Sequence, residues 1–313
     1  MLILNLITFI ISCTILIVSG IYLVKSLSKI SKILGISEFS AAFIIMAFAT
    51  SIPELLVGVS SAMAGNPSLS LGNIIGANII DLTLITGILI ISAKQIKFKS
   101  RRIKGDTETM LITLLLVIVL YVIGKSLSRI DGLILLCFFA FHTYKIFKKR
   151  QKYKGKIIHK TEKTKRFTWL IIFLFALIGL FISSNFVVKS ASALAIDLNF
   201  PDILIGLFLL SIATTLPELI FGLSAIKLRH KVMAIGDQIG TVIANSTLVL
   251  GIVAIMHPIT VEFLPFLTSA LFMFISAFIF VTFLKTGRKL EKIEGISLIL
   301  IYVLFITIEF FIK

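Results

Sequence analysis

The decapeptide ATSIPELLVG at residues 49–58 returns as ATTLPELIFG at residues 213–222. In each copy a proline and then a glutamate stand in the middle of an apolar stretch, and the two glutamates are Glu54 and Glu218. A carboxylate at bilayer depth costs roughly 2.5 to 3.5 kcal/mol on insertion scales, so its presence there indicates a functional site. Interrupted apolar segments at corresponding positions of two halves are typical of the binding site of a secondary transporter.

The composition places the chain in a membrane. Of its 313 residues, 58% are hydrophobic, and several apolar runs exceed the roughly 18 residues that suggest a membrane span. We expect an all-α membrane protein with ten transmembrane helices, the first of which is a true span and not a cleaved signal peptide. The predicted helices cover residues 2–24, 38–64, 69–92, 107–124, 130–147, 168–190, 202–226, 231–256, 260–284 and 293–311.

The two halves of the chain form an internal repeat. At a constant offset of 164 residues, and with no gap, residues 47–87 match residues 211–251 at 14 of 41 positions. The matches include a proline, a glutamate and four glycines, which shared apolar composition does not align. Five spans, an odd number, separate equivalent helices, so the halves must have opposite orientations in the membrane. The sequence therefore predicts two inverted five-helix repeats, at 1–147 and 168–313, joined by a basic linker at 148–167.

The formal net charge is +16, and the basic residues are unevenly distributed between the two sides of the membrane. If the sides alternate at each helix, the loops on one side hold 27 Lys and Arg residues and those on the other side hold 4. The positive-inside rule then puts both termini outside the cell membrane and the 148–167 loop in the cytoplasm. That loop is expected to contact anionic lipid head groups of the bilayer. Neither a nucleic acid nor a protein partner is implied.

Proline determines the expected chemistry of the first motif. Pro53 has no N–H and its ring crowds the carbonyl of Ala49, so carbonyls one turn upstream lose a partner inside the helix. A bound cation is one replacement that a hydrocarbon interior allows. Hydroxyl groups stand in the same turn of both copies, at Thr50, Ser51, Thr214 and Thr215. Together with the two glutamates they form a hard-oxygen set that suits Na⁺ or Ca²⁺. An ordinary transmembrane kink is the alternative, but it leaves the paired glutamates unexplained.

A second motif follows in each half, GNIIGANIID at residues 72–81 and GDQIGTVIAN at residues 236–245. A spacing of four residues puts the side chains at its sixth and tenth positions on one helix face. These are Ala77 and Asp81 in the first half, and Thr241 and Asn245 in the second. Its glycines form G-x-x-x-G patterns that allow close approach of helices. Asp237 lies nearer the start of its helix, where it either complements the helix N-terminus or has a function.

At these residues the chain resembles the Ca²⁺/cation antiporters, in particular the archaeal and bacterial Na⁺/Ca²⁺ exchangers. Their G-T-S-x-P-E motif is matched by ATSIPE and ATTLPE, and their G-N-x-x-G-S-N-x-x-N/D motif by the segments that begin at 72 and 236. The resemblance implies that Glu54 and Glu218 bind the central Ca²⁺, helped by Thr50 and Thr214. It implies flanking Na⁺ sites formed by the carbonyls of Ala47 and Ser211 and by the hydroxyls of Ser51, Thr215 and Thr241. It also implies that the first and sixth helices slide across a core of eight to alternate access.

The chain departs from that family pattern at several positions. Ala77 replaces a serine, which removes one oxygen from a flanking Na⁺ site. Close relatives have Asn in the first half and Asp in the second where this chain has Asp81 and Asn245, so three central carboxylates are kept in mirrored order. Asp237 and Val242 each replace an asparagine. These changes leave the Na⁺ stoichiometry open, and they leave room for coupling to protons through Asp81.

The function that these observations predict is exchange of Ca²⁺ for Na⁺ by alternating access, without enzymatic activity and without a resident cofactor. An H⁺-coupled cation exchanger is the alternative. Two other classes fit less well. A cation channel does not need an inverted repeat, and an aspartyl protease that uses Asp81 and Asp237 leaves Glu54 and Glu218 without a role.

Overall fold

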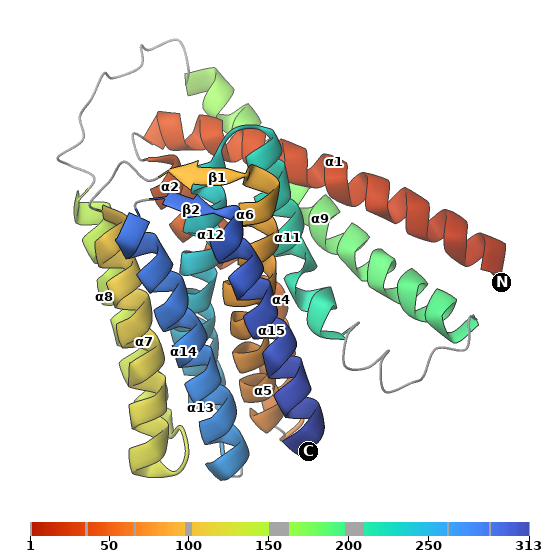
Figure 1. Cartoon of the computed structure of the whole chain (residues 1–313). Helices are drawn as coiled ribbons and strands as arrows, with labels where there is room; N and C mark the ends of the chain where they lie inside the picture. The colour runs from red at the N-terminus through yellow and green to blue at the C-terminus, as the bar shows by residue number, and fades with distance from the viewer. Residues whose placement is uncertain are drawn as a thin grey trace.

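The chain folds as a helical membrane protein, shown in the computed structural model of Figure 1. The structure describes residues 2–34, 37–65, 67–97, 102–149, 163–197, 210–261, 263–287 and 289–312. Within these residues seven helices are long and apolar enough to cross a membrane. Helices lie over all ten predicted ranges, although residues 202–209 of the seventh range fall outside the described residues. The number of ten spans stays a prediction.

Several of the helical segments follow one another in a continuous run. In the first half the elements are α1 (Leu2–Leu34), α2 (Glu38–Ala41), η1 (Ala42–Met46), α3 (Ala47–Thr50), α4 (Ile52–Met63), α5 (Pro67–Ile80), η2 (Asp81–Ile85), α6 (Thr86–Ala93), β1 (Gln95–Lys97), α7 (Arg102–Gly124) and α8 (Arg129–Lys149). In the second half they are α9 (Lys163–Asp197), α11 (Leu210–Lys227), α12 (Lys231–Ala244), η6 (Asn245–Val249), α13 (Leu250–Met256), α14 (Phe263–Gly287), β2 (Lys289–Glu291) and α15 (Lys292–Ile312). The η segments are single turns of π-helix.

The centre of the molecule is formed by two runs, α5–η2–α6 and α12–η6–α13. In each of them 78% of the most apolar window is buried, against 33% in α1 and in the apolar part of α9. A helix that is apolar on all sides and buried in protein belongs to the core of a membrane bundle, whereas a helix with one buried face borders lipid. The two motif segments at 72–81 and 236–245 therefore lie in the most enclosed part of the fold.

The helices α1 and α9 form a separate pair. They pack against each other along their length, and both also contact α11. Figure 1 shows them side by side and oblique to the helices α7, α13 and α14. At 33 and 35 residues and a rise of about 1.5 Å per residue, each is longer than the roughly 30 Å hydrocarbon layer. The predicted helices at 2–24 and 168–190 were therefore shorter than the helices α1 and α9 of the structure.

Glycines let the central runs approach their neighbours. A Cβ at Gly87 in α6 would lie 2.6 Å from the carbonyl oxygen of Gly295 in α15. A Cβ at Gly251 in α13 would lie 3.0 Å from the carbonyl oxygen of Gly132 in α8. Gly87 and Gly251 are 164 residues apart, so the same close crossing occurs at equivalent positions of both halves.

Two short extended pairs join loops of the two halves. The strands β1 and β2 pair antiparallel, with Gln95 opposite Glu291, and a single bridge joins Leu127 to Ile259. Adding 164 to 95 gives 259, and adding 164 to 127 gives 291, so the second pair is the repeat of the first. The sequence did not predict these strands. They are three residues long or shorter, and their partners are distant in the chain.

Candidate functional site

Glu54 stands at the start of a new helix. Helix α3 ends at Thr50, and Ser51, with φ −75° and ψ −1°, separates it from α4, which has Pro53 in its first turn. Proline suits that position because the first N–H groups of a helix have no partner inside it. Glu54 is 1% exposed. The carbonyl of Ala47 accepts from the Ser51 N–H at 3.1 Å and from Thr50 Oγ1 at 3.4 Å, so it keeps protein partners and is not left unpaired.

Glu218 occupies the equivalent place in the second half without a helix break. Helix α11 continues through Pro217, and Glu218 is fully buried. Thr215 is buried in the same turn, and Thr214 precedes it. Ser211 lies in the first turn of α11, but its side chain is outside the described part of the structure, so its predicted contribution to a Na⁺ site stays a prediction.

Asp81 and Asn245 each begin a turn of π-helix, η2 and η6. The two turns are 164 residues apart and equally long, so the repeat preserves this irregular geometry. A π-helical turn within an α-helix is rare and occurs frequently at functional sites. Both side chains are fully buried. Asp81 and Asn245 therefore occupy the same irregular turn in their respective halves.

Direct contacts join the motifs of the two halves. Thr50 Oγ1 lies 3.4 Å from Thr241 Oγ1. The amide of Asn245 donates to Oδ1 of Asn78 at 3.3 Å, and the amide of Asn78 donates to Oγ of Ser246 at 2.9 Å. The structure thus brings together residues of the motif segments that are more than 160 positions apart in the chain.

The interior of the molecule holds four carboxylates that lack hydrogen-bond donors. Glu54, Asp81, Glu218 and Asp237 are each at most 1% exposed, and within the described residues none of their eight oxygens has a hydrogen-bond partner. The groups are close enough to repel one another electrostatically, since Glu218 interacts with the other three. Buried carboxylates without donors or counter-charges are strongly unfavourable, so this region is suited to bind cations.

The carboxylates do not converge on a single point. Within the described ranges, no three His, Cys, Asp or Glu side chains form a group that could hold a metal ion. A cation bound here would therefore also need neutral oxygens. The Ser51 hydroxyl and Oδ1 of Asn245 are buried and have no hydrogen-bond partner among the described residues, and Thr241 is fully buried.

Two of the buried polar residues here were not predicted. Asn78, which is fully buried, connects the two halves; it matches the second Asn of the family motif, but no role was predicted for it. Gln238 is also fully buried, and neither atom of its amide has a partner among the described residues. Ala77 is buried, at 3% exposure, and its predicted effect on a flanking Na⁺ site stays a prediction.

The glycine pattern of the second motif is confirmed by its contacts. A Cβ at Gly236 would lie 2.7 Å from the carbonyl oxygen of Phe39, and one at Gly240 would lie 2.7 Å from Cβ of Ala47. For the glycines at 72 and 76, no described atom lies within 4 Å of the added Cβ. Their repeat-equivalent neighbours, 203 and 207, are outside the described residues, so close packing in the first half stays a prediction.

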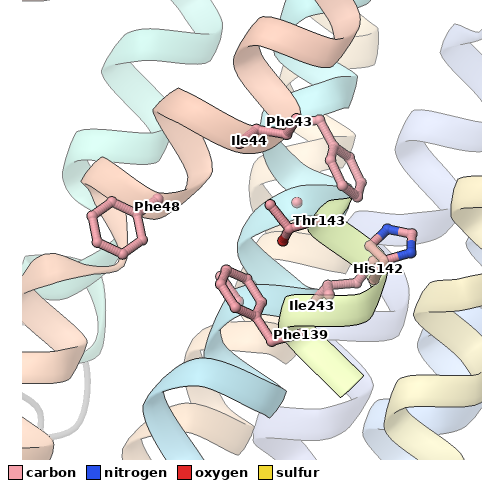
Figure 2. A pocket seen from close by; sticks show the side chains of 9 residues that line it. Phe43, Ile44, Phe48, Phe139, His142, Thr143 and Ile243 are labelled. Atoms are coloured by element: carbon pink, nitrogen blue, oxygen red, sulfur yellow. The ribbon is translucent and has the colours of Figure 1, made fainter. Parts of the chain in front are cut away.

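A mostly apolar pocket lies beside the contact of Gly240 with Phe43. Figure 2 shows that aromatic and aliphatic side chains surround it, with His142 and Thr143 as its polar members. Its lining is Phe43, Ile44, Phe48, Phe139, His142, Thr143, Gly240, Ile243 and Ala244. The lining contains no carboxylate, so this pocket is distinct from the region suited to cations.

Comparisons with known proteins agree with this geometry. The family model described as sodium/calcium exchanger protein matches residues 4–148 and 168–311. Sodium/calcium exchanger MaX1 of Methanosarcina acetivorans is 27% identical over 93% of this chain and 94% of its own length. Uncharacterized membrane protein MJ0091 of Methanocaldococcus jannaschii is 27% identical over 98% of each chain.

A solved structure has the same fold. The sodium-calcium exchanger NCX_Mj, in a crystal soaked with Na⁺ and Sr²⁺, superposes with a TM-score of 0.84 at 26% identity, covering 98% of this chain and 99% of its own. Between residues 4 and 311 the family model covers both halves and omits only 149–167, within the basic linker. The chain therefore belongs to the sodium/calcium exchanger protein family, a family of transporters and not of enzymes.

Proposed function

We propose that this protein is a secondary antiporter that exchanges Ca²⁺ for Na⁺ across the cell membrane. The observation that carries the proposal is the set of buried carboxylates without hydrogen-bond partners at the meeting point of the two halves. Such a set needs positive charge, and oxygen ligands of this kind suit Na⁺ and Ca²⁺. Family membership supports Na⁺ over H⁺ as the driving ion.

Glu54, Glu218 and Asp81 provide the negative charge of the proposed Ca²⁺ site, and neutral oxygens complete its ligand set. A divalent ion in a low-dielectric interior needs formal negative charge close to it, and these three carboxylates are near enough to repel one another when they are ionised. The hydroxyls of Thr50 and Thr214 belong to the same two turns and complete the ligand set. Two carboxylates already match the charge of the ion, but Ca²⁺ takes six to eight oxygens, so further ligands are needed.

The flanking Na⁺ sites follow the same logic with neutral oxygens. On the proposal, the side chains that contribute to them are Ser51, Thr215, Thr241 and Asn245, together with the carbonyls of Ala47 and Ser211. A monovalent ion needs less formal charge than a divalent one, so hydroxyls and carbonyls suffice. One of these sites lacks an oxygen at Ala77, and we infer that it binds Na⁺ more weakly than its counterpart with Thr241.

The proposed architecture is ten spans in two inverted five-helix repeats, 1–147 and 168–313. Three sets of equivalent features support it, each related by the same offset of 164 residues. They are the π-helical turns η2 and η6, the glycine crossings at Gly87 and Gly251, and the extended pairs of β1 with β2 and of Leu127 with Ile259. An inverted repeat places such pairs at opposite ends of the molecule.

The pair α1 and α9 is the proposed moving element. The two helices pack along each other and contact the rest chiefly through α11 and the α2 turn, and they lie oblique to the core helices. Sliding of this pair across the core alternates access to the central site. The distribution of Lys and Arg supports both termini outside and the 148–167 linker in the cytoplasm.

Isosteric neutralisation of the two glutamates tests the proposal. In proteoliposomes, Glu54→Gln and Glu218→Gln are each expected to abolish Na⁺-dependent ⁴⁵Ca²⁺ uptake, because each removes one charge opposite the ion and keeps the side-chain volume. Glu108→Gln makes the same change at an exposed side chain that pairs with Lys285, and it is expected to transport normally. Near-normal Ca²⁺ flux in both buried variants refutes the assignment.

A further inference from the structure

Asp237 is a fourth buried carboxylate that the proposed Ca²⁺ site does not use. It is fully buried, and neither of its oxygens has a partner among the described residues. The equivalent position in the first half is Asn73, a neutral amide. Gln238, the next residue, is buried and unpartnered in the same way. The negative charge at this position is therefore a property of the second half alone.

The position of Asp237 is defined by the geometry of α12. Residues 237, 241 and 245 follow one another at a spacing of four, so Asp237 lies on the helix face that carries Thr241 and Asn245. Four residues correspond to about 6 Å along the helix axis. The displacement is toward the start of α12, where Lys231 Nζ donates to the carbonyls of Ala93 and Gln95 at 2.7 and 2.9 Å. Asp237 thus lies one turn away from the central site, toward the end of the molecule that holds β1.

Asp237 remains electrostatically connected to the central site. It is repelled by Asp81, and Glu218 is in turn repelled by Asp237. Asp237 therefore lies one turn from Thr241 toward the β1 end of α12 and interacts with carboxylates of the central site. Its charge extends the negative potential of the site in that direction.

The described side chains provide no counter-charge for Asp237. Helix α12 packs against α2, η1, α3, α6, α7, α11, η2 and β1. On α2, Glu38 is paired with His230 at 2.8 Å, and Lys231 is held by the two carbonyls named above. No salt bridge involves Asp237 in the described part of the chain. An ionised carboxylate in this place needs a cation from outside the protein.

We propose that Asp237 forms an additional Na⁺ site on the pathway between the central site and the β1 end of α12. The inference rests on the proposed exchange function and adds a binding position to it. A single carboxylate suits a monovalent ion, because Ca²⁺ takes six to eight oxygens that commonly include several carboxylates, and the acidic groups that interact with Asp237 belong to the proposed Ca²⁺ site. Gln238 is the adjacent residue with an unpartnered buried amide oxygen.

Equilibrium binding of ²²Na⁺ to the purified full-length protein tests this site. Asp237→Asn is expected to lower the number of Na⁺ ions bound at saturation by one per chain and to leave ⁴⁵Ca²⁺ binding in place. Asp237→Glu keeps the charge and is expected to keep the wild-type number of ions. Asp237→Ser is measured in parallel, so that a folding defect of one neutral variant does not decide the result.

Asn73→Ala is the matched control at the repeat-equivalent position, because it removes a partly buried polar side chain without a change in charge. It is expected to bind as many Na⁺ ions as the wild type. An unchanged Na⁺ number in Asp237→Asn and Asp237→Ser overturns the site, and it means that a proton neutralises the carboxylate. If the wild type itself shows no Na⁺-dependent Ca²⁺ flux, the exchange function fails, and the site fails with it. The two failures are therefore distinguishable.

Discussion

The contact of Gly240 with the segment that carries the first motif offers a sharp steric test of the site. Gly240 in α12 faces the backbone of Phe43 and the methyl group of Ala47. A Cβ at this position would lie 2.7 Å from the Ala47 Cβ and 3.0 Å from the Phe43 carbonyl carbon, with the Phe43 carbonyl oxygen closer still. None of these atoms is the end of a flexible side chain. Gly240→Ala must therefore push α12 away from η1 and α3.

The size of the displacement follows from ordinary contact distances. Carbon atoms pack at about 3.5 to 4.0 Å, so the Cβ at position 240 and the Ala47 Cβ must move apart by about 1 Å more. Overpacking of this kind costs about 1 to 3 kcal/mol. The next residue is Thr241, whose hydroxyl already lies 3.4 Å from that of Thr50, so the same movement separates the two hydroxyls. If the whole cost falls on the ion-bound state, affinity decreases about 5- to 150-fold, since 1.4 kcal/mol corresponds to a factor of ten.

Na⁺-dependent ⁴⁵Ca²⁺ uptake in proteoliposomes and thermal unfolding of the purified protein measure this effect. Gly240→Ala is expected to raise the ion concentration for half-maximal exchange and to lower the melting temperature. Gly124→Ala is the matched control, because its Cβ would meet nothing closer than Ser126 Oγ at 3.9 Å among the described atoms. If Gly240→Ala has the same half-maximal concentration and melting temperature as the control, the packing argument is refuted.

Three other changes test separate parts of the site. Ala77→Ser adds one hard oxygen on the face of Asp81 and is expected to lower the Na⁺ concentration for half-maximal exchange, by a factor that corresponds to about 1 kcal/mol; an unchanged Na⁺ dependence contradicts the assigned weak site. Asp81→Asn is expected to reduce Ca²⁺ affinity at least tenfold, and the double variant with Asn245→Asp to recover part of it; a double variant no better than the single one contradicts a shared site. Lys231→Met removes two charged hydrogen bonds at the end of α6 and is expected to lower unfolding stability by about 1 to 2 kcal/mol in a thermal or denaturant assay, whereas Lys231→Arg should retain most of it.

Much of the site could be predicted because its chemistry is improbable in an apolar chain. A proline and a glutamate in the middle of a hydrophobic run do not arise from composition. Their return at the same offset as four glycines therefore indicates a common structure. The contact between Thr50 and Thr241 joins the first motif of one half to the second motif of the other, and the repeat alone does not specify that pairing.

The length of α1 could not be predicted from hydrophobicity alone. After residue 24 the sequence KSLSKISKIL is rich in lysine, which indicates a loop when charge is taken as the end of a span. In the structure the helix continues to Leu34. Lys25 lies 5.5 Å from the centre of the Tyr22 ring, and Lys29 lies 5.9 Å from that of Trp169. Long lysine side chains can extend their charge toward water while the helix continues.

The π-helical turns and the amide contacts had no readable signal. The turn η2 begins at Asp81 within an unbroken helical segment. A π-helical turn contains one more residue than an α-helical turn, and no particular residue type marks it in the sequence. Asn78 and Ser246 lie 168 positions apart, an offset that the register of 164 does not give. Such contacts depend on the angle at which two helices cross, and the period of a single helix does not determine that angle.

The amide contacts give a physical reason for the mirrored order of the third carboxylate. The Asn245 amide donates to Asn78, and the Asn78 amide donates to Ser246. A carboxylate at 245 can only accept when it is ionised, so it would remove the first of these bonds and place two acceptors opposite each other. At position 81 no described side chain donates to the carboxylate, so its charge is available to a cation. The exchange of Asp81 and Asn245 therefore preserves the number of charges but disturbs the contact between the halves, which is why the double variant is expected to recover only part of the Ca²⁺ affinity.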